Sequence, residues 1–457
     1  MFDLVISNGT LVTSEATTRA DLGISSGKIV AIGTGLMGRE KLDAMGMLVV
    51  PGAIDEHVHL QMPVGEFTSS DDFYTGTVAA ACGGTTTVID FAEPKSKQTL
   101  VEALVERQAE ADGKVVVDYG LHMTLCQTDD GTLAQVRTCI DAGAASFKLY
   151  MAYEGLRLDD GGLLRALATL RDHGGRVLVH AENHHAIVYL IAQALSKGCT
   201  GPENHPLTRP ALMEAEAIHR LLSLAHITRT PLVLAHLSCA LGLEEVRAAR
   251  ARGTTVWVET CPQYLLLDEK EYHRSGFEGA KFVMAPPPRT KADRAALWAG
   301  LAAGEVNTVA TDHCPFFYET QKIRGRDDFS RIPGGAPGIE TRLSLLYSHG
   351  VLSGQLTPER WVEVCCTEPA HRFGLAPRKG TLSVGADADV VIFDPEHRAT
   401  LSVNSLHQNV DYCPYEGWEV QGYPVKVLSR GEVIVENGKF VGTAGRGRFL
   451  HSVPLDY

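Results

Sequence analysis

The sequence lacks the cysteine pattern of a disulfide-bonded protein or of a thiolate metal site. Its ten cysteines are scattered and contain no Cys-x-x-Cys pair. Only Cys365 and Cys366 are adjacent. Neither a disulfide framework nor a cysteine zinc site is therefore indicated. We expect a protein of the reducing cytoplasm.

Positive charge and long apolar runs are also scarce. The 457 residues include 42 lysines and arginines against 55 aspartates and glutamates, which gives a formal net charge of -13. Because affinity for nucleic acid comes mainly from clustered Lys and Arg, we expect no nucleic-acid partner. The stretch from Met1 to Gly9 has no basic leader and no apolar run long enough for a signal peptide or a membrane span. We expect it to form a first strand, and we expect no membrane partner.

The two ends of the chain share a sequence pattern that is typical of β-strands. Short apolar runs alternate with turn pairs, such as Asn8-Gly9 near the start and Asn437-Gly438 near the end. Asn-Gly between alternating apolar residues is a strong hairpin signal. We therefore expect residues 1–50 and 375–445 to form one small β-sandwich domain, followed by a C-terminal tail over 446–457.

The middle of the chain, residues 51–374, alternates short apolar strands with amphipathic stretches such as 99–112 and 163–173. This alternation predicts βαβ units and a parallel sheet. Eight candidate strands end near His59, Asp90, Thr124, Lys148, His180, His236, Glu259 and Asp312. Eight strands close a barrel, so we expect an α/β fold with a catalytic (β/α)8 TIM-type barrel over 51–374.

The strongest local signal is the pair of histidines in Val50-Pro-Gly-Ala-Ile-Asp55-Glu-His57-Val-His59. Residues two apart in a strand point to the same face, so both imidazoles can reach one metal ion. Two incidental histidines would give the same pattern. The motif becomes informative only with the residues that end other strands.

Four further polar residues end apolar runs in the same way. His180, His236, Lys148 and Asp312 would all lie on the rim where active sites of such barrels are built. Each histidine alone is more often an ordinary rim residue than a ligand. A lone lysine usually reaches the surface or pairs with an acid. A lysine neutralised by burial can instead take up carbon dioxide as a carbamate that bridges two cations.

These residues belong to longer blocks that resemble the dihydropyrimidinase and hydantoinase branch of the amidohydrolase superfamily. The blocks around the candidate ligands are His57-Val-His59, Ser146-Phe-Lys148, His180-Ala-Glu-Asn183, His236-Leu-Ser238 and Thr311-Asp312-His-Cys314. Further matching blocks are 80–87, 257–265, 380–389 and 411–417. The resemblance covers nearly the whole chain.

The resemblance implies a metal-dependent hydrolase that opens 5-substituted hydantoins or 5,6-dihydropyrimidines to N-carbamoyl amino acids. Two divalent ions, zinc or alternatively manganese or cobalt, would hold a bridging hydroxide as the nucleophile. The implied ligands of one ion are His57, His59, carbamylated Lys148 and Asp312, and those of the other are the same carbamate, His180 and His236. A homotetramer is also implied.

Two residues acquire catalytic roles from the resemblance. Asp312 would orient the hydroxide, accept its proton and pass it to the leaving ring nitrogen. Tyr153, in Tyr150-Met-Ala-Tyr153, would donate a hydrogen bond to the developing oxyanion. The alternative for Tyr153 is a tyrosine that is merely packed on the rim.

Other positions bear on the substrate. Met62, Val64, Phe67, Tyr150 and 156–158 correspond to loops that cradle the ring substituent, and their apolar character favours an uncharged or aromatic group.

Three more positions concern the ring itself. Ala285 stands where many relatives have a serine, and Gly334 stands where they have an asparagine. In the relatives, these positions hold the ring amide largely through backbone groups. Gln61 stands where related dihydroorotases carry an arginine, which disfavours a strongly acidic substrate.

Two other functions remain open at this point. An allantoinase-type enzyme would open a cyclic ureide with the same site. A non-catalytic scaffold would keep the barrel and lose the chemistry, but such proteins typically lose metal ligands, whereas this sequence retains all six candidates and Tyr153.

Overall fold

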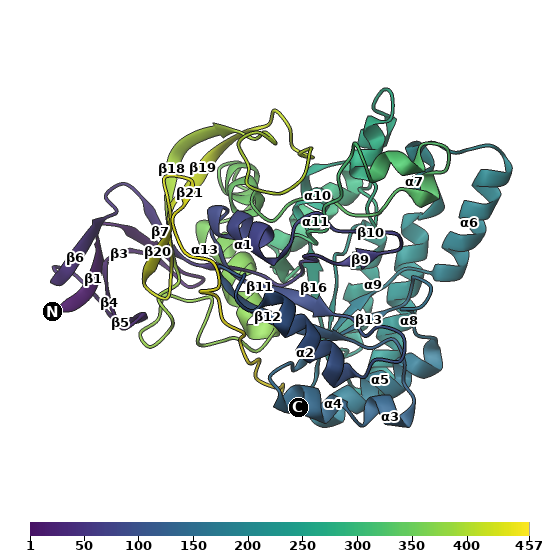
Figure 1. Ribbon diagram of the computed structural model, residues 1–457, viewed down its shortest axis with the longest axis horizontal. Coiled ribbons are helices and arrows are strands. Elements are labelled where there is room, and N and C mark those ends of the chain that lie inside the picture. The colour runs from purple at the N-terminus through teal and green to yellow at the C-terminus, as the bar shows by residue number, and fades with distance from the viewer. Residues whose placement is uncertain (457) are drawn as a thin grey trace.

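In the computed structural model, which describes residues 1–456, eight parallel strands form a barrel in the order in which they occur in the chain. They are β8 (Ala53–Asp55), β11 (Thr85–Ala92), β12 (Asp118–Thr124), β13 (Ser146–Tyr150), β14 (Arg176–His180), β15 (Leu232–Leu234), β16 (Val256–Thr260) and β17 (Thr308–Val309). The expected (β/α)8 architecture is confirmed (Figure 1).

The barrel strands are apolar because both of their faces are covered. Every residue of β11 and of β12 is buried, as is typical of a parallel strand between a packed interior and a layer of helices. The register then decides which strand ends are neighbours. Tyr150 at the end of β13 pairs with His180 at the end of β14.

Side chains close the barrel where β8 meets β17. The guanidinium of Arg342 donates to the carbonyl oxygen of Ile54 and to that of Val309, both at 2.8 Å. The hydroxyl of Thr311 donates to Asp55 at 2.7 Å. The first and last strands are therefore joined largely through buried side chains.

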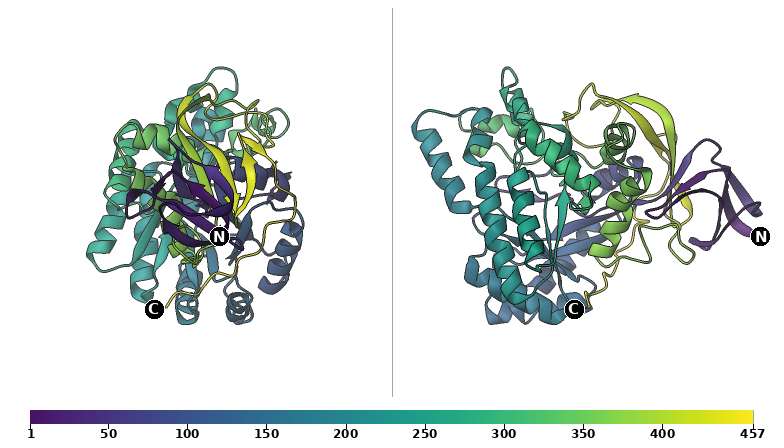
Figure 2. Two further views of the ribbon diagram at one scale, coloured as in Figure 1. Left: turned by 90° about the vertical axis from the view of Figure 1, so that its left-hand side faces the viewer. Right: turned by 180° about the vertical axis from the view of Figure 1, so that it is seen from behind.

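Helices follow the strands and cover the outside of the barrel (Figure 2). The α-helices are α1 (Phe73–Cys82), α2 (Leu100–Ala111), α3 (Asp130–Leu133), α4 (Val136–Asp141), α5 (Asp160–His173), α6 (His184–Ser196), α7 (His205–Thr208), α8 (Ala211–Thr228), α9 (Ala240–Ala251), α10 (Pro262–Leu266), α11 (Lys291–Ala302), α12 (Arg342–Leu346), α13 (Pro358–Val362) and α14 (Glu368–Arg372). The shorter 3-10 and π turns are η1 (Pro202–Asn204), η2 (Glu269–His273), η3 (Glu278–Phe282), η4 (Lys322–Gly325), η5 (Phe329–Arg331), η6 (Tyr347–Val351) and η7 (Glu363–Thr367). Within residues 1–456, no helix has both the length and the apolar character needed to cross a bilayer.

Local sequence signals set the ends of the longer helices. Thr99 and Glu102 form a reciprocal capping box at the start of α2. Asp159 caps the start of α5, and Gly174 ends that helix with a φ of 74°. These caps explain why the expected helices at 99–112 and 163–173 form close to where the sequence places them.

The two ends of the chain build two further sheets. One has the order β21-β20-β19-β18-β7-β2-β3 and the other β5-β4-β1-β6. Their strands are β1 (Phe2–Ser7), β2 (Thr10–Val12), β3 (Thr17–Arg19), β4 (Asp21–Ser25), β5 (Lys28–Gly33), β6 (Gly38–Asp43), β7 (Leu48–Pro51), β18 (Val390–Thr400), β19 (Glu419–Ser429), β20 (Glu432–Glu436) and β21 (Lys439–Phe440). A small hairpin of β9 (Pro63–Val64) and β10 (Phe67–Thr68) lies apart from these sheets.

Early and late segments pair directly in the larger sheet, where Val49 of β7 lies opposite Ile392 of β18. The β-structure shared by the two termini is therefore confirmed. The boundaries placed at residues 50, 375 and 445 stay predictions.

The C-terminal tail follows the amino ends of the barrel strands. Leu450 donates its backbone N–H to Tyr119, Val453 to Gly374 and Leu455 to Gly174, at 2.7 to 2.9 Å. The last residue of the predicted tail, Tyr457, lies outside the described residues. The tail thus covers the end of the barrel opposite the rim on which the predicted site residues lie.

Candidate active site

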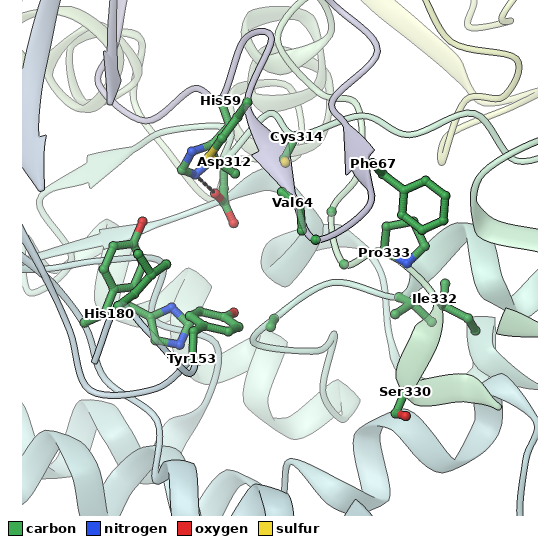
Figure 3. Close-up of a pocket in the computed structure, with 18 of the residues that line it drawn as sticks. His59, Val64, Phe67, Tyr153, His180, Asp312, Cys314, Ser330, Ile332 and Pro333 are labelled. Atoms are coloured by element: carbon green, nitrogen blue, oxygen red, sulfur yellow. Dashed lines mark hydrogen bonds and ion pairs between the residues drawn. The ribbon is translucent and has the colours of Figure 1, made fainter. Parts of the chain in front are cut away.

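A cavity of about 700 Å³ opens at the carboxyl ends of the barrel strands. Twelve of the residues singled out from the sequence line it, and Figure 3 labels His59, Val64, Tyr153, His180 and Asp312 among them. They are His57, His59, Met62, Val64, Lys148, Tyr150, Tyr153, His180, His236, Ala285, Asp312 and Gly334. Residues that are far apart in the sequence therefore meet in one hollow.

One group of donor atoms gathers around Asp312. Its Oδ1 atom lies 3.1 Å from His59 Nε2 and 3.4 Å from His57 Nε2. Lys148 Nζ lies 3.3 Å from the same His57 nitrogen. His57, His59 and Asp312 are placed so that their ligand atoms could hold a metal ion.

A second pair of ring nitrogens lies beside this group. His180 Nδ1 and His236 Nε2 are 3.0 Å apart, and the rings of His57 and His236 are 5.3 Å apart between centroids. Imidazole nitrogens and carboxylate oxygens are the donors that zinc and related divalent ions prefer. The second pair therefore adds two further nitrogen donors beside the first group.

Carboxylates behind the histidines orient the rings. Glu259 Oε1 lies 2.7 Å from His57 Nδ1 and also accepts the backbone N–H of His236 at 2.9 Å. Glu182 contacts His180 Nε2 at 2.9 Å and Arg209 at 2.6 Å. Such outer partners fix which ring nitrogen carries the proton and which is free to bind a metal.

Sequence reasoning assigned no role to these outer residues. Glu259 ends a predicted strand, and Glu182 lies two residues after His180. Position at a strand end could therefore have marked both acids. Arg209 lies in a loop before α8 and gave no such signal.

Burial controls the protonation of the donors. It lowers the pKa of His57, His180 and His236, mainly by desolvating the charged ring, and the nearby Lys148 adds to the effect. The rings are therefore neutral and keep a lone pair for a metal. Burial also lowers the pKa of the Lys148 amine to about 8.

Three site residues have backbone conformations that are rare for side chains with a Cβ. The φ angles are 74° at Tyr153, 37° at His236 and 51° at Asp312. Such residues cost free energy, about 1–3 kcal/mol each, and cluster where function requires a particular side-chain direction. The surrounding barrel must hold these three residues in place.

Tyr153 lies against the second pair of histidines (Figure 3). Its ring centroid is 4.9 Å from that of His180, and the Arg209 guanidinium is 5.8 Å from its centre. Burial raises the pKa of the Tyr153 hydroxyl. The phenol therefore stays protonated and can act as a hydrogen-bond donor.

The residues expected to contact substrate form two walls. Met62, Val64, Phe67 and Leu156 lie on the cavity surface. Leu158 does not, because its backbone N–H donates to Tyr150 and its side chain packs into the core. Of 156–158, only Leu156 lines the cavity, and the role of this loop in holding the substituent stays a prediction.

The opposite wall is built from loop backbone near Ala285 and Gly334. Gly335 donates its backbone N–H to the carbonyl oxygen of Val283 at 3.0 Å. The buried Lys322 amine donates to Val283 at 3.1 Å and to Pro333 at 2.9 Å. These bonds hold the two loops against each other, while Gln61 lies outside the residues that line the cavity.

A (β/α)8 barrel with histidines, a lysine and an aspartate on one rim is typical of metal-dependent hydrolases. Residues 48–434 match the model of the Amidohydrolase family, and the chain belongs to this family. Its enzymes are metal-dependent hydrolases, and this chain carries candidate metal-binding residues in His57, His59 and Asp312.

Named relatives resemble the chain over nearly its full length. It is 45% identical to a D-hydantoinase of Geobacillus stearothermophilus, over 98% of this chain and 96% of that protein. It is 43% identical to a D-phenylhydantoinase of Escherichia coli, over 99% and 98%. The crystal structure of a dihydropyrimidinase from Brevibacillus agri matches with a TM-score of 0.98 and 42% identity, over 99% of both chains. The expected resemblance to this branch is confirmed, and it is favoured over the allantoinase alternative.

Proposed function

We propose that this hydrolase opens the ring of 5-substituted hydantoins or 5,6-dihydropyrimidines and releases N-carbamoyl amino acids. The observation that carries the proposal is the convergence of four imidazoles, the Lys148 amine and the Asp312 carboxylate on one cavity. Its volume of about 700 Å³ lies within the usual range for small-molecule sites. The names of the relatives support the choice of ring.

The proposed cofactor is a pair of divalent ions, zinc first and manganese or cobalt as alternatives. His57, His59 and Asp312 would hold one ion, and His180 and His236 the other. We propose that Lys148 is carbamylated and serves both ions. Its buried amine, with a pKa lowered to about 8, supports this step because only the neutral amine can attack carbon dioxide.

The ions, when bound, supply a water whose pKa is lowered enough to attack an amide at neutral pH. Asp312 takes the proton of the attacking water on its carboxylate and passes it to the ring nitrogen as the C–N bond breaks. Tyr153 donates its hydroxyl proton in a hydrogen bond to the carbonyl oxygen of the scissile amide. Backbone groups at Ala285 and Gly334 would orient the ring.

A substrate panel tests the ring assignment. Hydantoin, phenylhydantoin, dihydrouracil, allantoin and dihydroorotate would be compared side by side, with both optical forms where they exist. We expect turnover of the hydantoins or of dihydrouracil. Allantoin as the best substrate would replace the proposal with the ureide alternative.

Replacing Lys148 by Ala tests the centre itself. We expect bound metal and turnover to be lost, with partial rescue by short carboxylic acids that imitate the carbamate. Lys197→Ala, at an exposed lysine that follows α6, is the matched control and should keep both. Normal metal content in the Lys148→Ala variant would contradict the proposed bridging role.

We further propose that the chain assembles as a homotetramer in the cytoplasm. Exposed apolar side chains on α6, α7 and α8, three helices that Figure 1 labels, support self-association. These residues are Val188, Tyr189, Leu207, Leu212 and Ile227. Exposed apolar patches of this kind typically mark protein interfaces. The ten cysteines are free thiols, which supports a reducing compartment.

A further inference from the structure

Four acidic side chains line the cavity, namely Glu66, Glu93, Glu154 and Asp312. Three of them have basic or imidazole partners. Glu66 lies 3.5 Å from Arg331, Glu154 lies 3.3 Å from His184, and Asp312 contacts His57 and His59.

Glu93 is different. In the part of the chain that the structure describes, no basic side chain lies within ion-pair distance of its carboxylate. Its one hydrogen bond comes from the Tyr150 hydroxyl at 3.4 Å, which is long for an O–H donor. A partly buried carboxylate with one weak neutral donor leaves most of its acceptor capacity unused.

The position of Glu93 places this carboxylate near the reacting end of the cavity. The residue directly follows β11, and its partner Tyr150 has its ring centroid 5.9 Å from that of Tyr153. Tyr150 also belongs to the wall expected to receive the ring substituent. Glu93 therefore adds an acidic group to a wall that sequence reasoning described as apolar.

The two arginines of the cavity are paired with other carboxylates. Arg209 is held by Glu182 at 2.6 Å, and Arg331 faces Glu66 at the exposed mouth. Burial raises the pKa of Glu93, and the opposing effects of His59, of the Tyr150 hydrogen bond and of Arg107 are smaller, so its anionic form is incompletely compensated. A cation brought by a ligand would supply the missing partner, since hydrogen bonds between opposite charges are the strong ones.

We propose that Glu93 forms a cation subsite, and that the enzyme prefers cyclic amides whose ring substituent carries an ammonium or guanidinium group. This inference rests on the proposed ring-opening function and narrows its substrate class. The products would be N-carbamoyl derivatives of basic amino acids. In the competing role, which we call positional, Glu93 only orients the Tyr150 hydroxyl and binds no cation.

Two hydantoins of matched size test the subsite, 5-(4-aminobutyl)hydantoin and 5-pentylhydantoin, which differ by a terminal ammonium in place of a methyl group. The measurement is the ratio of their kcat/KM values, cationic over neutral. We expect a ratio above one for the wild-type enzyme and a fall of about tenfold or more in Glu93→Gln, because one charge-assisted contact is lost. Glu93→Lys should lower the ratio further through repulsion.

Two controls separate the subsite from general effects. Glu66→Gln makes the same chemical change at a carboxylate whose side chain is 63% exposed, and it should leave the ratio unchanged. Tyr150→Phe removes the hydroxyl and should also preserve the preference. A ratio that falls in Tyr150→Phe as it does in Glu93→Gln would support the positional role instead.

The outcomes also separate this inference from the proposed function. A wild-type enzyme that opens 5-pentylhydantoin but shows a ratio of one or less would overturn the cation subsite alone. So would a ratio that Glu93→Gln does not change. Failure to open either of these hydantoins, phenylhydantoin or dihydrouracil, with metal bound, would overturn the proposed function and this inference with it.

Discussion

At the scale of single residues, Tyr153 combines a costly backbone conformation with a buried hydroxyl beside the histidine cluster. We predict that Tyr153→Phe lowers kcat by about a hundredfold or more, the usual effect of removing one oxyanion donor. Steady-state kinetics and metal analysis of the same preparation would check this, with metal content expected to stay normal. Unchanged turnover would remove Tyr153 from the mechanism.

Lys148 gives a pH-dependent prediction at the same scale. An amine reacts with carbon dioxide only after it loses its proton, and burial lowers the pKa of Lys148 from 10.5 to about 8. In metal-free protein, carbamate formation should therefore rise as the pH passes through about 8. An ordinary lysine would require a pH above 10.

The carbamate is measured with ¹³C-labelled bicarbonate by NMR. Lys322 is a second buried amine, with a pKa lowered to about 7, so a Lys148→Ala sample is needed to assign the signal. A signal that persists in that variant would show that another amine reacts.

At the scale of elements, the seam between β8 and β17 depends on Arg342. The side chain is 1% exposed and donates to carbonyl oxygens of both strands and to Thr85. We predict that Arg342→Met destabilises the fold by ~3 kcal/mol, because it leaves buried carbonyl groups without a donor. The shift of the urea unfolding midpoint would measure this.

A matched control is Arg39→Met, which removes an arginine whose side chain is 74% exposed and lies 3.4 Å from Asp3. An exposed pair of this kind contributes little, so the midpoint should barely move. Equal shifts in the two variants would show that the seam does not depend on Arg342.

At the scale of the whole molecule, the exposed apolar residues of α6 lead to a prediction about the oligomeric state. Tyr189 is 66% exposed and Val188 is 50% exposed. We predict that Val188→Glu together with Tyr189→Glu converts the assembly into smaller species, because burying unpaired charges at an interface is costly. Light scattering after gel filtration would measure the mass. Val384→Glu, at a position 62% exposed before β18, is the control and should leave the mass unchanged.

The barrel and its strand ends could be predicted because they depend on local patterns. Apolar runs of strand length that end in polar residues occur in the sequence itself, and the parallel topology sends all their carboxyl ends to one rim. For this reason the sequence alone predicts that His57, His59, Lys148, His180 and Asp312 lie together. The domain boundaries and the ligand roles stay predictions.

The type of fold, the cluster of candidate ligands and the family follow from the amino-acid sequence, because strand periodicity and motif spacing are properties of neighbouring residues. The groups that support that cluster, and those that face the cavity, follow from the folded structure. Glu259 lies behind His57, Arg342 joins the two strands of the seam, and Tyr150 is the hydrogen-bond donor to Glu93, and each of these contacts joins segments that are distant in the chain. No local pattern encodes such contacts, since they form only when the barrel closes.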